Sequence, residues 1–213
     1  PEKKLGIDGR VFISKSSADY IPNLSTGARS YDLVVGVGFL MADQLAAVAK
    51  RFPDTKFAIV DYPAAALKGA PKNARGILFA EQEAGCLAGV AAATESKSGV
   101  IASVGGQKIP PVDHYIAGYQ YCAKKVKPGI KTLNDYSQDF VDQAKCKEIA
   151  LNQIGEQADV IFQVAGGCGL GAIQAAKESK DWGIGVDADQ FYLGKQVLTS
   201  ALKKVDVGVF DTI

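Results

Sequence analysis

Short apolar runs alternate with segments of helical spacing along most of the chain. The runs are rich in Val, Ile and Leu and are as short as typical buried β-strands. They predict strands at Val11–Ser14, Leu33–Val37, Phe57–Val60, Gly76–Phe79, Val100–Val104, Ile130–Tyr136, Val160–Val164 and Ile184–Asp187. Because strands that alternate with helices form βαβ units, the pattern predicts an α/β fold with parallel sheets flanked by helices.

The segments between these strands carry apolar residues at helical spacing. They predict helices at Leu40–Arg51, Gln82–Thr94, Asp113–Val126 and Ala172–Lys177. In the alanine-rich second helix, Gly85 and Gly89 lie four residues apart and therefore on one face. We expect this face to pack closely against another helix.

The composition changes at Gly105–Val112, where the sequence is GGQKIPPV. Two glycines end a strand there, and we expect Pro110 and Pro111 to exclude both helix and central strand. The segment is therefore the predicted hinge of a two-lobed protein whose cleft closes on a ligand. The expected lobes are residues 1–106 with 201–213, and residues 107–200.

The two ends of the chain suggest that segments are missing from both. The first predicted strand follows almost directly after the opening PEKKLGID, and the last residues, VGVFDTI, are apolar without a closing turn. We expect a chain truncated at both ends.

Composition narrows the class of ligand. The 24 basic and 23 acidic residues leave a formal charge of +1, so no electrostatic footprint for nucleic acid or an anionic membrane is present. No apolar run approaches the ~20 residues that span a bilayer. A neutral or zwitterionic small molecule is the expected ligand.

The four cysteines do not suggest a metal site, because they are far apart and only His114 is available to join them. Cys86 and Cys168 lie in apolar contexts and are expected to be core residues. Cys122 and Cys146 lie on more polar predicted helices, so they are the candidate pair for a disulfide in an oxidising compartment, and the sequence leaves open whether they form it.

The most informative stretch is Asp159–Gln190, in which a buried strand leads through a glycine-rich turn into a helix and a second strand that ends at Asp187. Ligands of open parallel sheets bind beyond the carboxyl ends of the strands, which is where Gly166 and Asp187 would lie. Gly166 lets the main chain approach a ligand, although a tight turn alone would also require it. An ionised Asp187 can accept both hydroxyl protons of a cis-diol.

The same stretch supports a competing interpretation, an NAD-binding oxidoreductase. Residues Gly167–Ala172 fit G-x-G-x-x-A between a strand and a helix, with Asp187 about twenty residues later, as a dinucleotide site requires. Against this, the pattern lies late in the chain, and the single histidine, His114, is expected at a surface helix start. Ser103 and Ser137 lack the G-x-S-x-G context of a nucleophile.

Four segments together resemble one known family. They are YDLVVGVGFLMADQLAAVAKRFPDTKFAIVD at Tyr31–Asp61, FAEQEAGCLAGV at Phe79–Val90, GVIASVGGQKIPPV at Gly99–Val112, and GVDADQ at Gly185–Gln190. In this order they resemble the basic membrane protein family, the purine nucleoside receptor lipoproteins of ABC transporters. The resemblance runs from about Asp19 to Ile213.

This resemblance implies a type I periplasmic-binding-protein fold, anchored by a lipid outside the cytoplasmic membrane. Such a protein captures purine nucleosides between its lobes and delivers them to an ABC permease, without enzymatic activity, cofactor or metal. The family's Asp-Lys-Ser-Phe-Asn type motif and its lipidated amino-terminal cysteine have no match here. One wall of the expected pocket is thus unassigned.

The resemblance also assigns roles to individual residues. Phe140 occupies the position that stacks on the base, and Asp43 the position of an acid that accepts a base N–H, with Phe39 lining the same wall. Lys203 matches a lysine beside the ribose, where it would balance Asp187. Each has a simpler explanation: packing for Phe140, helix capping for Asp43 and surface exposure for Lys203.

Two neighbours of these residues are expected to have lesser roles. One of Asp187 and Asp189 is expected only to cap the following segment, and Lys204 to be solvated. A third class of function, a ligand sensor or regulator with the same two-lobed fold, is also left open by the sequence.

Overall fold

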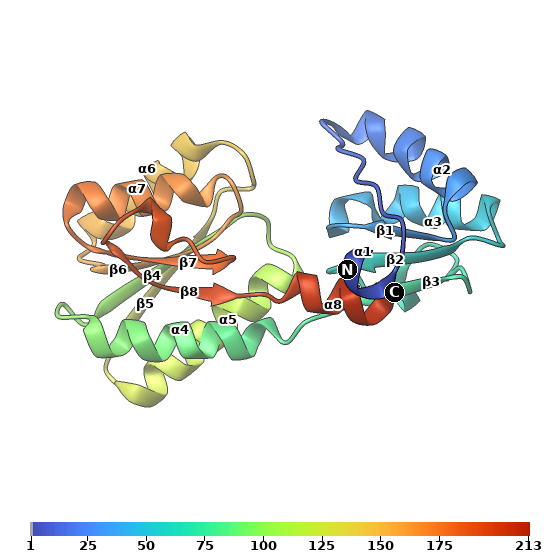
Figure 1. Ribbon diagram of the computed structural model, residues 1–213. Coiled ribbons are helices and arrows are strands. Elements are labelled where there is room, and N and C mark those ends of the chain that lie inside the picture. Colours follow the sequence, from blue (N-terminus) through green and yellow to red (C-terminus); the bar gives the residue numbers. More distant parts are fainter. Residues whose placement is uncertain (1) are drawn as a thin grey trace. The chain divides into compact units, whose positions relative to one another are not determined.

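The computed structural model describes residues 2–213 and contains two compact units. Unit 1 holds the residues up to Phe79 together with Lys204–Ile213, and unit 2 holds Ala80–Lys203. Each unit is a parallel β-sheet flanked by α-helices, so the predicted fold class is confirmed (Figure 1). Within the described residues, no helix is both long and apolar enough to cross a membrane.

Unit 1 has a three-stranded sheet with the order β1-β2-β3. Its strands are β1 (Leu33–Gly36), β2 (Lys56–Val60) and β3 (Ala74–Ile77), and its helices are α1 (Glu2–Leu5), α2 (Tyr20–Ser30), α3 (Ala42–Arg51) and α8 (Val205–Thr212), with 3₁₀ turns η1 (Ser17–Asp19), η2 (Phe39–Met41) and η3 (Ala64–Ala66). Successive residues of β2 face opposite sides. Phe57 packs on the side of α2 and α3, and Ala58 on the side of α8.

Unit 2 has a five-stranded parallel sheet with the order β5-β4-β6-β7-β8. Its strands are β4 (Val100–Gly105), β5 (Lys131–Tyr136), β6 (Val160–Val164), β7 (Trp182–Asp187) and β8 (Val197–Leu202), and its helices are α4 (Glu81–Glu95), α5 (Pro110–Val126), α6 (Gln143–Gly155) and α7 (Gly169–Ser179), with the 3₁₀ turn η4 (Phe191–Leu193). Helices α4 and α5 cover one face and α6 and α7 the other (Figure 1). On β6, Phe162 faces the first pair and Ile161 the second.

Helices α4 and α5 pack at very short range through glycines. A Cβ on Gly85 or Gly89 would overlap the main-chain oxygen of Tyr115 or Tyr119, and a Cβ on Gly118 would overlap that of Gln82. The close packing expected from the spacing of Gly85 and Gly89 is confirmed.

The cysteines form two disulfides, Cys86–Cys122 and Cys146–Cys168, with Cα–Cα distances of 5.0 and 5.5 Å. The candidate pairing of Cys122 with Cys146 does not form. Cys168 is the buried core residue that the sequence predicts, whereas Cys86 is partly exposed, and each of the two is bridged to another cysteine. The physical reason is topological: Cys122 lies on α5 and Cys146 on α6, which cover opposite faces of the sheet. Each cysteine instead pairs within its own helix layer.

One predicted strand does not form, and one strand of the structure was not predicted. The segment Val11–Ser14 is irregular, and Val11 and Ile13 remain 86% and 79% exposed because no strand pairs with them. Strand β8 was missed because Thr199 and Ser200 interrupt its apolar pattern, as is common for an edge strand. The strand expected at Gly76–Phe79 begins two residues earlier, at Ala74.

The structure also divides the chain elsewhere than at the expected hinge. Strand β4, assigned to the first lobe by the sequence pattern, pairs with β5 and β6 at the centre of the unit 2 sheet. Segment Gly105–Val112 therefore connects β4 to α5 inside unit 2. Pro110 and Pro111 occupy the first positions of α5, where the missing N–H groups have no helical partner to lose.

We predict that Gly89→Ala destabilises unit 2 by about 1–3 kcal/mol, because the new methyl group must push α5 away from α4. Gly155→Ala in α6 is the matched control, since its Cβ would meet no atom within 4 Å. It should change the free energy of unfolding by less than about 1 kcal/mol. Denaturant unfolding of both variants checks this, and equal effects would contradict the packing described.

Candidate functional site

The carboxyl ends of the five strands of unit 2 lie along one edge of the sheet. The order β5-β4-β6-β7-β8 makes β4 and β6 the pair at which the chain connections diverge. In open α/β sheets, ligands bind in the crevice at this point. Gly105 ends β4 there, opposite Val164 of β6.

Phe140 and Gly166 come together beside this point. Phe140 lies in the loop between β5 and α6, and its ring covers Gly106, where a Cβ would overlap the ring. A Cβ on Gly166 would lie 3.6 Å from the same ring, and Gly166 has a φ of +56°. Gly166 is therefore needed for its left-handed backbone, and it places no side chain of its own against the ring.

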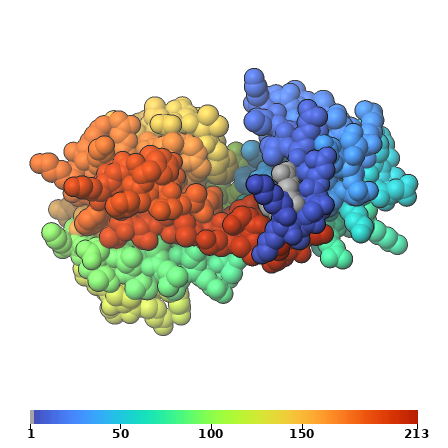
Figure 2. Space-filling view, in the orientation of Figure 1, coloured from blue at the N-terminus to red at the C-terminus, as the bar shows by residue number. Residues whose placement is uncertain are grey.

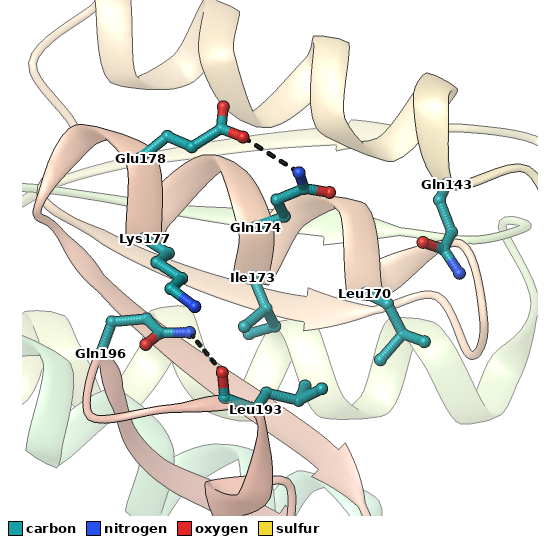
Figure 3. A pocket seen from close by; sticks show the side chains of 8 residues that line it. All are labelled: Gln143, Leu170, Ile173, Gln174, Lys177, Glu178, Leu193 and Gln196. Carbon is teal, nitrogen blue, oxygen red and sulfur yellow. Dashed lines mark hydrogen bonds between the residues drawn. The ribbon is translucent and has the colours of Figure 1, made fainter.

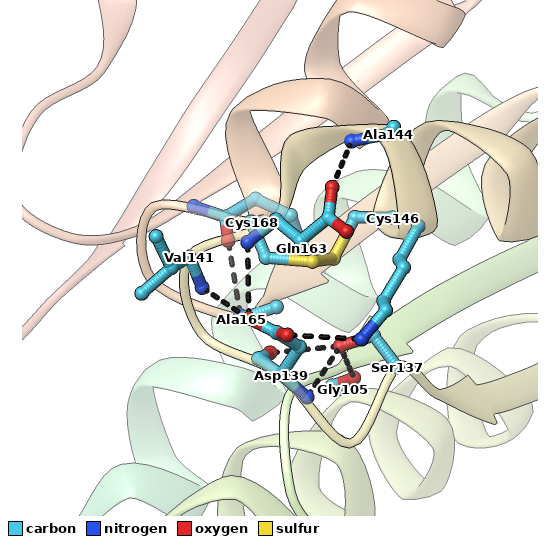
Figure 4. The surroundings of a disulfide bond; sticks show 11 residues. Gly105, Ser137, Asp139, Val141, Ala144, Cys146, Gln163, Ala165 and Cys168 are labelled. Atoms are coloured by element: carbon cyan, nitrogen blue, oxygen red, sulfur yellow. Dashed lines mark hydrogen bonds and ion pairs between the residues drawn. A yellow bond between two sulfur atoms is a disulfide. The ribbon is translucent and has the colours of Figure 1, made fainter.

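The loop that carries Phe140 is shaped by Asp139. The main-chain N–H groups of Asp142 and Val141 donate to its carboxylate at 3.0 and 2.7 Å, and Lys145 Nζ lies 3.0 Å away (Figure 4). Together they hold the pKa of Asp139 well below its usual range. Asp142 in turn caps α6 by accepting from Ala144 N. The loop thus enters α6 in a fixed turn.

Asp187 ends β7 on the same edge, with a left-handed φ of +63°. Its main-chain oxygen accepts from Lys203 N at 2.8 Å, which extends the β7–β8 ladder by one bond. The Tyr115 hydroxyl, from α5, donates to Asp187 Oδ1 at 3.3 Å. Backbone pairing therefore brings Lys203 beside Asp187, the arrangement that the family resemblance implied.

The ammonium of Lys203 is buried between two carboxylates. Lys203 Nζ lies 3.3 Å from Glu81 Oε1 and 3.8 Å from Asp187 Oδ1, and it also lies over the Tyr115 ring. The side chains of Lys203 and Glu81 are each 4% exposed, whereas that of Asp187 is 54% exposed. The closer, buried Glu81 balances Lys203, and Asp187 is the member of the cluster that solvent or a ligand reaches.

Helix α4 and strand β8 make this pairing possible because they lie side by side in unit 2. In Figure 2 the red residues of β8 lie directly against the green residues of α4. Glu81 is in the first turn of α4, where a carboxylate also interacts favourably with the helix dipole. His114 of α5 approaches the outer side of the cluster, with Nδ1 3.6 Å from Glu81 Oε2.

The carboxyl of Asp187 has a raised pKa. Desolvation by the surrounding protein is the largest cause, and the negative charge of Glu81 acts in the same direction, while Lys203 and the Tyr115 hydroxyl lower the pKa in part.

A buried amide network supports the turn after Asp187. Gln163 Nε2 donates to Gln190 Oε1 at 2.7 Å, and that oxygen also accepts from Val186 N. Gln163 Oε1 accepts from Ala165 N, and Ser200 Oγ accepts from Gln190 N. The network links the carboxyl ends of β6, β7 and β8 and fixes the positions from which Gly166 and Asp187 project.

The two remaining predicted residues lie in unit 1, after the carboxyl end of β1. Phe39 is the first residue of η2 and is partly buried, and Asp43 is exposed in the first turn of α3. Their assigned contacts with a base stay predictions from the resemblance.

The sequence missed Glu81, Tyr115 and Gln163. Glu81 is explained locally by helix polarity, and Tyr115 and Gln163 are explained by the core, so no local signal marks them. Asp189 accepts from Phe191 N at 3.0 Å, which gives it the capping role expected of one of the two acids.

The glycines of the turn have a structural explanation that needs no dinucleotide. A Cβ on Gly169 would overlap the Gln163 side chain, and one on Gly171 would overlap the main-chain oxygen of Gln143 in α6. A Cβ on Gly167 would lie 3.2 Å from Phe140 O. Packing of α7 against β6 and α6 thus accounts for Gly169 and Gly171, and the close approach of the Phe140 main chain accounts for Gly167.

A separate groove lies beside α7. It has a volume of about 660 Å³ and is lined by residues of α6, α7, η4 and the loop before β8, among them Leu170, Ile173, Lys177 and Gln196 (Figure 3). It contains none of the predicted site residues. Among the described residues, no group of three His, Cys, Asp or Glu side chains is arranged to hold a metal ion.

Comparison with known proteins gives the family. The family described as "ABC transporter substrate-binding protein PnrA-like" matches residues 3–212. The chain belongs to this PnrA-like family. The resemblance to basic membrane proteins is therefore confirmed.

Individual PnrA-like relatives agree with this assignment. The chain is 37% identical to the ABC transporter nucleoside-binding protein BmpA of Lactococcus lactis, over 98% of this chain and 64% of the relative. It is 35% identical to an uncharacterised lipoprotein of Pyrococcus abyssi, over 100% of this chain and 56% of the relative. The chain thus spans less than two thirds of the length of these relatives.

A solved structure with a similar fold is an ABC transporter solute-binding protein from Aeropyrum pernix. It superposes with a TM-score of 0.82 at 29% identity, and the match covers 99% of this chain and 61% of that one. The two-lobed periplasmic-binding fold of the PnrA-like family is therefore the fold of this chain.

We predict that Lys203→Met destabilises unit 2 by about 3–5 kcal/mol, because Glu81 would remain buried without its closest counter-charge. Lys204→Met is the matched control, since the neighbouring Lys204 is exposed and should cost less than about 0.5 kcal/mol. Denaturant unfolding monitored in unit 2 measures both. Similar stabilities of the two variants would show that the Lys203–Glu81 pair is not structurally important.

Proposed function

We propose that this protein is the extracytoplasmic substrate-binding component of an ABC importer, and that it captures a purine nucleoside and delivers it to a permease. The observation that carries the proposal is the pair of Asp187 and Lys203 at the carboxyl edge of unit 2. The name of the Lactococcus lactis relative supports the class of ligand. The family supports a binding role rather than a catalytic one.

The chemistry of a nucleoside suits these groups. A ribose cis-diol offers two hydroxyl donors, which the accessible oxygens of Asp187 can accept in charge-assisted bonds. Lys203 supplies a donor for a sugar oxygen and keeps the cluster from accumulating two uncompensated negative charges. The ligand itself need carry no charge.

The aromatic group suits the base. Phe140 has its ring beside Gly166, which places no side chain of its own against the ring. Stacking of a base on an aromatic ring contributes roughly 1–3 kcal/mol. In this proposal Phe39 and Asp43 of unit 1 also serve the base, the first by lining it and the second by accepting an N–H.

The proposed location is the outer side of the cytoplasmic membrane, with attachment through a lipid. The lipoprotein name of the Pyrococcus abyssi relative supports this. Two disulfides are also typical of proteins that work outside the reducing cytosol, although proteins of hyperthermophiles are an exception.

Calorimetric titration of the full-length protein with a panel of ligands tests the proposal. Purine ribosides should bind and raise the unfolding temperature, and a ligand at one hundred times its Kd should add about 2.7 kcal/mol of stability. Free purine bases and ribose should bind much more weakly, because each retains only part of the contacts. If no nucleoside gives heat or thermal stabilisation, the proposal is wrong.

A further inference from the structure

The Cys146–Cys168 disulfide lies directly behind the loop that carries Phe140. Cys146 is in the first turn of α6, four residues after the end of the Asp139 turn, and Cys168 is the residue before α7. Both cysteines are 0% exposed. Figure 4 shows the bond between these two segments, with Asp139, Val141 and Ala165 close by.

The two segments joined by this disulfide also meet through Phe140. Cys168 N donates to Phe140 O at 3.0 Å, and the Gly167 backbone lies against the same oxygen. The ring of Phe140 lies against Gly106 and close to Gly166. The residue assigned to stack on the base is thus held by its main chain to the segment that Cys168 anchors.

The segment that receives Phe140 is rich in glycine. It contains Gly166, Gly167, Gly169 and Gly171, and glycine loses more conformational freedom on folding than any other residue. The hydrogen bonds of Asp139 and Asp142 are all local to the Phe140 loop and to α6, so they shape this loop without tying it to β6. The Cys146–Cys168 disulfide covalently links α6, which follows the Phe140 loop, to the glycine-rich segment after β6.

We propose that the Cys146–Cys168 disulfide is a positioning device for ligand binding, which holds the Phe140 ring and the Gly166 turn in register before the ligand arrives. The inference rests on the proposed function, since it concerns the affinity for the base. A wall that is fixed in advance does not have to be ordered on binding, so the disulfide raises affinity without contacting the ligand. Cys146 and Cys168 act through Phe140.

The second disulfide provides a matched control. Cys86–Cys122 joins α4 to α5 on the opposite face of the sheet, and both cysteines are partly exposed. We compare the double variants C146A/C168A and C86A/C122A in two measurements. The first is hydrogen exchange of the amides of residues 138–142 and 165–168 in the ligand-free protein, and the second is the affinity for a purine nucleoside.

In C146A/C168A, exchange at these amides should accelerate at least about fivefold more than in the control, and affinity should fall about three- to tenfold. The affinity loss should disappear in a Phe140→Ala background, because the disulfide acts through that ring. A purely structural disulfide would lower stability but would not show this dependence on Phe140. Equal affinity losses in the two double variants, or unchanged exchange in the Phe140 loop, would overturn the proposal.

Reduction offers a second route if C146A/C168A does not fold. In C86A/C122A, only Cys146–Cys168 can be reduced. A trialkylphosphine supplies two electrons and water supplies the two protons, which gives two thiols and the phosphine oxide. Protein reduced in denaturant and refolded without oxygen should show the same faster exchange and weaker binding, reversed by reoxidation.

The exchange measurement uses no ligand, so it separates the two hypotheses. Faster exchange in the Phe140 loop without any nucleoside binding to the wild type would reject the proposed function and leave the role of the disulfide in ordering this loop. Nucleoside binding that is unaffected by removal of the disulfide would reject the inference alone.

Discussion

The burial of one ammonium group organises the candidate site. The Lys203 side chain is 4% exposed, and a buried charge without a partner costs far more than most single interactions contribute. The β7–β8 ladder brings Lys203 to Asp187, and the packing of α4 beside β8 brings Glu81 to the other side. Because Glu81 is the closer and fully buried partner, Asp187 keeps accessible oxygens while remaining next to a positive charge.

Much of this architecture can be predicted from the sequence because it follows local periodicity. The buried strands β2, β4 and β6 read as apolar runs, and the glycine spacing of α4 predicts its close contact with α5. Strand β8 is not predicted from the sequence, because an edge strand such as VLTSAL needs no continuous apolar run. The disulfide pairing is not predicted either, because it depends on which face of the sheet each helix covers. That is a property of the topology and not of the spacing of residues along the chain.

The residues of the candidate site also differ in whether the sequence predicts them. Asp187 and Gly166 are predictable from their place at the carboxyl ends of strands, and Phe140 and Lys203 only from the family resemblance. Glu81, Tyr115 and Gln163 are not predictable, because a helix-start acid, a core tyrosine and a strand glutamine become partners only when distant segments pack together. The residues proposed to contact a ligand are thus easier to predict than those that hold them in place.

The central claim, that Asp187 accepts the sugar hydroxyls, is tested most directly by a double-mutant cycle between Asp187→Asn and a 2′,3′-dideoxynucleoside, read by calorimetry. Each change alone should weaken binding by about 2–4 kcal/mol, since either leaves a polar group without its partner, and both together should cost little more than one. Asp189→Asn, whose carboxylate caps η4, should show no coupling to the hydroxyls. Additive losses in the Asp187 cycle would contradict the account.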